Sequence, residues 1–207
     1  MFRHGPAPPE RRSDRACADG PAPGSSDYDL DPAARPASAP LRAASVLVPL
    51  VERGPGLGVL LTRRAALLAH HPGQVAFPGG KRDEGDRDAA DTALREATEE
   101  IGLDRALAEV IGHMPRYLTG TMFTITPVVA LVRPDYRLTL NPYEVADAFE
   151  VPLHFLMDPR HHRRHAIEFS GTRREWFSMP YADGDKERFI WGATAAMLRN
   201  FYRFLSA

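Results

Sequence analysis

The sequence GGKRDEGDRDAADTALREATEEIGL, residues 79–103, decides the fold of this chain. On a helix each residue turns the chain by about 100°, so this stretch separates an apolar stripe from a group of carboxylates. The stripe consists of Ala90, Leu94, Ala97 and Ile101, and the carboxylates are Glu96, Glu99 and Glu100. Like charges three or four residues apart on a helix repel each other. The stretch therefore predicts an amphipathic helix whose acidic face favours a cation, most simply a divalent ion.

Both ends of the stretch support a helix. Asp86 and Asp88 are good N-cap residues, and Gly102 can adopt the left-handed conformation that closes a helix. The preceding residues 78–80, Pro-Gly-Gly, predict a loop whose backbone can approach a phosphate. Magnesium is usually held by a few carboxylates, several waters and substrate phosphates, so this arrangement indicates a cation bound between the protein and a pyrophosphate.

The same stretch resembles a Nudix box, the signature of a hydrolase family. The matching residues are Arg95, Glu96, Ala97, Glu99, Glu100, Gly102 and Leu103. The segment between Gly80 and Arg95 is one residue longer than the usual pattern, and the acidic residue expected there falls on Asp86. The upstream sequence LLTRRAALLAHHPGQVAFPGG, residues 60–80, is similar to the longer signature of the coenzyme A pyrophosphatase branch, which tolerates this insertion.

The fold class that follows is α/β. The resemblance implies a Nudix-type α/β/α sandwich with a mixed sheet, and the hydrophobic pattern agrees with it. The pattern predicts paired strands within 43–64, a short strand at 73–78, strands at 109–114 and 123–132, a hairpin joined at Gly171 and a terminal helix at 192–205. Residues 140–158 predict a short helical or irregular segment.

The N-terminal region has a different composition from the rest of the chain. Residues 1–40 contain eight of the 19 prolines, mixed with small residues and charges of both signs. Such a segment cannot bury enough apolar surface to pack. We therefore predict a disordered tail over residues 1–40 and one Nudix domain over residues 41–207, with the box at 79–103.

The overall charge is close to balanced. The 207 residues include 26 Lys and Arg against 27 Asp and Glu, a net charge of −1, which does not indicate nucleic acid or a membrane as partner. Cys17 is the only cysteine, which excludes an internal disulfide and suits a reducing compartment. We expect a cytoplasmic monomer or homodimer that acts on a small-molecule substrate.

The resemblance implies a metal-dependent enzyme. The activity it implies is hydrolysis of the pyrophosphate bond of coenzyme A or acyl-coenzyme A, giving 3′,5′-ADP and 4′-phosphopantetheine or its acyl form, with Mg²⁺ or Mn²⁺ as cofactor. An alternative is the same chemistry on ADP-ribose, dinucleotides or nucleoside triphosphates. A non-catalytic nucleotide-binding regulator is a third possibility, although it predicts the loss of box carboxylates, and all three are present.

The box residues have distinct expected roles. Glu96 and Glu100, four residues apart, are the expected direct metal ligands. Glu99 completes the family motif and is expected to bind a second ion or to position the attacking water. Arg95 is expected to hold a carboxylate of the loop or helix by a bidentate pair, because the planar guanidinium suits that geometry. Gly79 and Gly80 are expected to contact the substrate.

Further candidates lie outside the box. Glu144 occupies a segment that lies near the active site in related enzymes, so it is a candidate distal base or ligand, or alternatively a glutamate at a helix start near an Asn cap. His71 and Gln74 belong to the branch signature and either contact the substrate or brace the loop. Arg63 and Arg64 are candidate phosphate contacts, although one of them must point away in a regular strand.

The run HHRRH, residues 161–165, is a separate basic feature. Its first two histidines lack the spacing of a helical metal pair, so we expect an exposed basic loop. A contact with a terminal phosphate of the substrate is the alternative.

Overall fold

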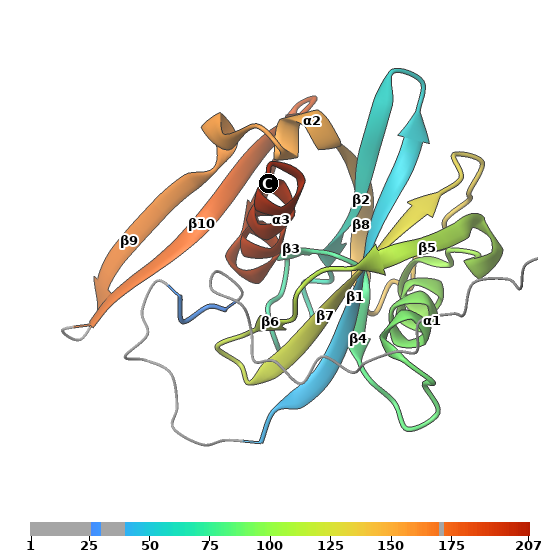
Figure 1. Cartoon of the computed structure of the whole chain (residues 1–207), viewed down its shortest axis with the longest axis horizontal. Coiled ribbons are helices and arrows are strands. Elements are labelled where there is room, and N and C mark those ends of the chain that lie inside the picture. Colours follow the sequence, from blue (N-terminus) through green and yellow to red (C-terminus); the bar gives the residue numbers. More distant parts are fainter. Residues whose placement is uncertain (1–25, 30–39, 170–171) are drawn as a thin grey trace, which may run out of the picture.

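Two sheets and two long helices make up the described part of the computed structural model, which comprises residues 26–29, 40–169 and 172–207 (Figure 1). The strands are β1 (Arg42–Arg53), β2 (Gly56–Arg64), β3 (Val75–Ala76), β4 (Gly79–Lys81), β5 (Ala108–His113), β6 (Tyr117–Leu118), β7 (Phe123–Val132), β8 (Val145–Pro152), β9 (Arg163–Phe169), β10 (Thr172–Asp183) and β11 (Lys186–Trp191). The helices are α1 (Ala89–Ile101), α2 (Leu153–Leu156) and α3 (Gly192–Leu205), with 3₁₀ turns η2 (Arg105–Leu107) and η3 (Pro159–His161).

The first eight strands form one mixed sheet that is covered on both faces. β1 runs parallel to β7 and antiparallel to β2 and β4, while β9, β10 and β11 form a second, antiparallel sheet. Successive side chains of a strand point to opposite faces, so Leu47 and Val51 of β1 pack with α1, whereas Val46 and Val48 pack on the α3 side. Figure 1 shows α3 between the main sheet and the β9–β10 hairpin. The predicted α/β/α sandwich with a mixed sheet is confirmed.

The box helix has the ends that its sequence predicts. The side chain of Asp88 caps α1 by accepting the amide of Asp91 at 2.8 Å. Gly102 closes the helix with φ 68°, and its amide donates to carbonyls of the last turn. Asp86, the other candidate cap, lies before the helix and pairs with Arg95.

The segment after β7 differs from the expectation. Residues 140–158 were expected to be helical or irregular, but Val145–Pro152 within them form strand β8, which is followed by the single turn of α2. β8 pairs with β2 from Gly58 to Arg64, and it buries Val145, Phe149 and Val151. The strand depends on this partner, which local sequence does not reveal.

A short part of the predicted tail contacts the domain. Within residues 26–29, the amide of Asp27 donates to the carbonyl of Leu118 in β6 at 2.9 Å. The carboxylate of Asp27 accepts the buried hydroxyl of Tyr117 and the amide of Gly120. This segment therefore differs from the expected unpacked tail. The remainder of that tail, residues 1–25 and 30–39, lies outside the described residues.

Asp27→Ala is expected to lower the free energy of unfolding by about 1–3 kcal/mol, because it removes the acceptor of two hydrogen bonds, one of them from a buried hydroxyl. Urea unfolding monitored by circular dichroism measures the change. Asp185→Ala, in an exposed turn, is the control and should change the value by less than about 0.5 kcal/mol. Equal values for the two variants would show that residues 26–29 do not stabilise the domain.

Candidate active site

The three box carboxylates differ sharply in exposure. The side chain of Glu99 is 55% exposed and that of Glu96 is 16% exposed, whereas Glu100 is buried. The carboxylate of Glu100 accepts the backbone amide of Gly79 at 3.1 Å. The acidic face of α1 therefore lies against β4, and its deepest carboxylate is fixed by the backbone of the glycine segment.

The two glycines of this segment lie in close contact with neighbouring groups. A Cβ on Gly80 would lie 2.7 Å from the carboxylate of Glu96. A Cβ on Gly79, which has φ 155°, would lie 2.4 Å from the carbonyl oxygen of Ser45 in β1. The expected loop is in fact the short strand β4, paired with β1. Pairing with β1 brings the glycine backbone against α1.

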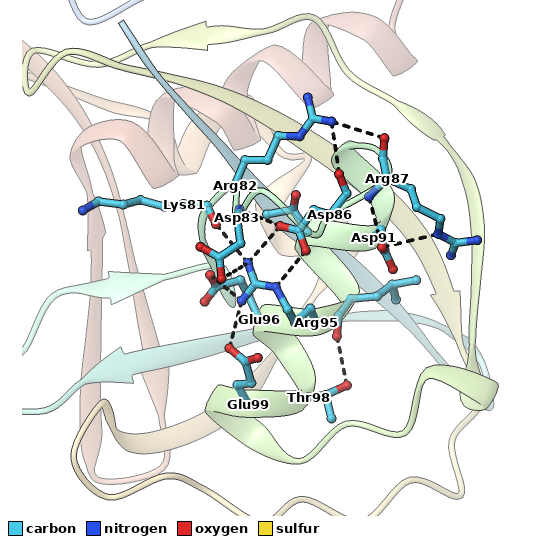
Figure 2. A network of polar contacts seen from close by, with 12 residues as sticks. Lys81, Arg82, Asp83, Asp86, Arg87, Asp91, Arg95, Glu96, Thr98 and Glu99 are labelled. Carbon is cyan, nitrogen blue, oxygen red and sulfur yellow. Dashed lines mark hydrogen bonds and ion pairs between the residues drawn. The ribbon is translucent and has the colours of Figure 1, made fainter.

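Arg95 lies at the centre of the polar network in Figure 2. Its guanidinium donates to both carboxylate oxygens of Asp86 at 2.9 and 3.0 Å, which is the bidentate pair that the sequence predicts. It also donates to Glu99 at 2.9 Å, approaches Glu96 within 3.1 Å, and donates to the carbonyl of Lys81 at 3.0 Å. The hydrogen bond from Arg95 holds the pKa of Asp86 well below its usual range. Arg95 thus fixes the loop and two box carboxylates relative to each other.

Glu96 and Glu100 carry an unfavourable concentration of negative charge. Burial raises the pKa of Glu96 despite the opposing effect of Arg95. Burial also raises the pKa of Glu100 to about 7, and the neighbouring charges of Glu96 and Glu144 add to the increase. Burial and like charges both disfavour the ionised forms of these two glutamates. A bound divalent cation would favour the ionised forms and so offset both effects.

The donor set fits a hard cation that takes only part of its coordination from protein. Oxygen ligands from few carboxylates, completed by water and substrate phosphate, are typical of magnesium. Across the described ranges, no three acidic, histidine or cysteine side chains are already assembled as a metal site. Glu96 and Glu100, with Glu99 beside them, are the residues of α1 that would hold the ion.

Glu144 lies in the turn that precedes β8. The backbone of this turn is hydrogen-bonded to the end of α1 and to the residue that follows β2. Asn141 donates its amide to the carbonyl of Glu100 at 2.9 Å, and the carbonyl of Glu144 accepts the amide of Ala65 at 2.8 Å. The charge of Glu144 raises the pKa of both Glu96 and Glu100. The structure therefore brings Glu144 near the box carboxylates. The alternative of a glutamate at a helix start is wrong, because β8 follows this turn.

Arg63 and Arg64 point to different surroundings. The positive charge of Arg64 acts to lower the pKa of Glu100, whereas that of Arg63 acts to lower the pKa of Asp147 in β8. The Nε of Arg64 is buried and has no hydrogen-bond partner in the described structure. Arg64 is thus on the side of the box carboxylates, and Arg63 is the one that points away.

His71 and Gln74 belong to the turn between β2 and β3. His71 is exposed with φ 54°, and its carbonyl accepts the amide of Gln74 at 3.3 Å. The side-chain amide of Gln74 lies near Gly192 at the start of α3, 3.3 Å from where a Cβ would stand. No hydrogen bond between described residues joins either side chain to the carboxylates of α1. Their geometry agrees with bracing of the turn, and a substrate contact stays a prediction.

Gly80→Ala is expected to reduce turnover by about tenfold with little loss of stability, because the added methyl group displaces the flexible carboxylate of Glu96 from its position. Steady-state kinetics and thermal unfolding test both parts. Gly85→Ala is the matched control in the loop that follows β4, where a Cβ meets nothing within 4 Å. Similar kinetics for the two variants would show that the position of Glu96 does not matter.

Comparison with known proteins identifies the family of this chain. A family model of the NUDIX domain matches residues 40–187. The chain is 40% identical over 159 residues to the uncharacterized Nudix hydrolase NudL of Escherichia coli (strain K12), covering 76% of this chain and 80% of that protein. It is 38% identical over 160 residues to Nudix hydrolase 15, mitochondrial, of Arabidopsis thaliana, covering 76% of this chain but only 56% of that relative's length.

The fold also resembles a solved structure. The Nudix hydrolase RenU of M. smegmatis superposes with a TM-score of 0.55 at 19% identity, covering 80% of this chain and 86% of RenU, which supports the fold alone. Within the described residues, no helix is long and apolar enough to cross a bilayer. The match to the family model and the identity to NudL show that the chain belongs to the Nudix hydrolase family.

Proposed function

We propose that this Nudix hydrolase cleaves the pyrophosphate bond of coenzyme A or acyl-coenzyme A, giving 3′,5′-ADP and 4′-phosphopantetheine or its acyl form. The observation that carries pyrophosphate hydrolysis is the pair formed by the half-buried Glu96 and the buried Glu100, held against the glycine backbone of β4. The choice of coenzyme A rests on the similarity of residues 60–80 to the signature of that branch.

The proposal includes Mg²⁺ or Mn²⁺, held by Glu96 and Glu100, with Glu99 as a further ligand or as the residue that positions water. Such an ion lowers the pKa of a bound water and neutralises phosphate charge. Arg64 is the proposed donor to a phosphate oxygen, and the effect of its charge on Glu100 supports this role. Glu144 is the candidate base, because it lies near the two ligands and is itself held only through its backbone in the hydrogen bonds described above.

A substrate panel tests the proposal. Coenzyme A, acetyl-coenzyme A, ADP-ribose, diadenosine polyphosphate and a nucleoside triphosphate are incubated with the full chain at equal concentration, with Mg²⁺, with Mn²⁺ and with chelator, and the products are separated by chromatography. We expect the highest kcat/KM for a coenzyme A substrate, with 3′,5′-ADP as product. A higher value for ADP-ribose, a dinucleotide or a triphosphate would overturn the substrate, and turnover in chelator would overturn the metal. Binding without turnover would support a regulator.

Location and assembly remain predictions. The single cysteine suits a reducing compartment, and we propose the cytoplasm. Fractionation of cells that express the tagged protein tests the location, and light scattering tests whether it is a monomer or a homodimer.

A further inference from the structure

The basic run at residues 161–165 does not form the expected exposed loop. It ends η3 and begins β9, and two of its histidines are engaged in packing. The ring of His161 stacks on Phe155 with centroids 3.9 Å apart, and His165 stacks on Trp176 at 5.4 Å. Between them, the ring of His162 packs edge-on against Tyr202 of α3 with centroids 5.2 Å apart, and its Nε2 donates to the carbonyl of Leu156 at 2.7 Å.

Arg199 of α3 faces this part of the hairpin. Its guanidinium lies over the ring of Phe177 in β10, 4.4 Å from the centroid, while its Nε is buried without a hydrogen-bond partner in the described structure. Phe177 is directly opposite Arg164 in the β9–β10 pairing, and opposite residues project to the same side of a sheet. Arg164 of β9 and Arg199 of α3 therefore lie on the same side of the hairpin, beside Phe177.

Positive charge dominates this side of the hairpin. Burial lowers the pKa of Arg199, and the charges of Arg203, one turn further along α3, and of Arg164 lower it further. The pKa of His162 is lowered first by burial and then by Arg199. Nearby acids are engaged, since Glu175 accepts from Arg164 and Asp158 accepts from Arg160. In the described part of the chain, neither Arg199 nor Arg203 takes part in an ion pair.

We propose that Arg164, Arg199 and Arg203 form a phosphate-binding site between α3 and the β9–β10 hairpin. The planar guanidinium group binds phosphate oxygens through two parallel hydrogen bonds, and Phe177 holds Arg199 in a fixed orientation for this. α1 and α3 cover opposite faces of the main sheet. The site is therefore separate from the box carboxylates and does not depend on the proposed reaction.

Calorimetric titration of the full chain with inorganic phosphate, in chelator and at constant ionic strength, tests the proposal. We expect saturable binding that Arg199→Met weakens about tenfold, a loss of about 1.4 kcal/mol. Arg203→Gln, an exposed position that should not affect folding, is expected to weaken binding severalfold. Arg137→Met removes the same charge from an exposed position elsewhere and should leave the affinity unchanged.

A second titration series identifies the source of the phosphate group. If 3′,5′-ADP shows the larger dependence on Arg199, the site takes a phosphate monoester, and if inorganic phosphate does, it takes the free ion. Both results support a phosphate site. The proposal fails if the wild-type chain binds neither compound, if Arg199→Met and Arg203→Gln bind like wild type, or if Arg137→Met loses as much affinity as they do.

Discussion

Replacement of Glu100 with glutamine is expected to lower turnover by at least about a hundredfold, which corresponds to roughly 3 kcal/mol of transition-state stabilisation. The two side chains have nearly the same shape, and the amide oxygen can still accept the amide of Gly79. The substitution removes the negative charge and the strong oxygen ligand that a hard cation prefers. Steady-state kinetics at saturating metal should show a large fall in kcat and a smaller change in KM.

The same substitution should stabilise the metal-free protein. Burial raises the pKa of Glu100 from its ordinary value of 4.5 to about 7, so ionisation of this side chain opposes folding. One pKa unit corresponds to about 1.4 kcal/mol, which sets an upper limit of about 3 kcal/mol for the gain. The wild-type chain loses this stability as the pH rises from 4.5 to about 7. The advantage of Glu100→Gln should therefore develop over that range and be complete above it.

Glu84→Gln is the matched control for both measurements, because Glu84 is an exposed glutamate of the loop before α1. It should leave turnover and the pH dependence of unfolding unchanged. Turnover of Glu100→Gln within a few-fold of wild type, or unfolding in place of inactivation, would mean that the metal site lies elsewhere.

The features predicted well from sequence have local causes. Helix α1 follows from its apolar stripe and from the capping preferences of Asp88 and Gly102, which act within a few residues of each other. The sequence predicts that Arg95 forms a bidentate pair with a nearby carboxylate, because a guanidinium beside several carboxylates favours that geometry. The structure shows this pair with Asp86. The sequence alone did not identify which carboxylate it would select.

The features that were missed depend on distant partners. Strand β8 exists because β2 satisfies its backbone groups, and its sequence alone gives a weak signal. Alternation predicts that Arg63 and Arg64 diverge, but only the position of α1 decides that Arg64 is the one near Glu100. The contact of Asp27 with Tyr117 joins residues 90 positions apart.

Replacement of Arg95 with methionine is expected to cause the largest loss of stability among these substitutions. The change leaves the carboxylate of Asp86, 4% exposed, without its cationic partner. Breaking a buried pair in this way costs about 3–5 kcal/mol, and the partial exposure of Arg95 places the expected loss near the lower value. Arg105→Met is the matched control, because Arg105 pairs with Asp91 of the same helix but is 43% exposed. That pair should contribute less than about 1 kcal/mol.

Two further measurements separate loss of the ion pair from loss of packing. Arg95 lowers the pKa of Asp86 below its ordinary value of 3.8, so the stabilisation is present above that pH and is lost as the pH falls through the lowered value. The difference between wild type and Arg95→Met should therefore shrink in strong acid. Addition of Asp86→Asn to Arg95→Met should recover part of the lost stability, because no buried charge then lacks a partner. Strictly additive losses that do not change with pH would instead mean that Arg95 acts mainly through the packing of its aliphatic chain.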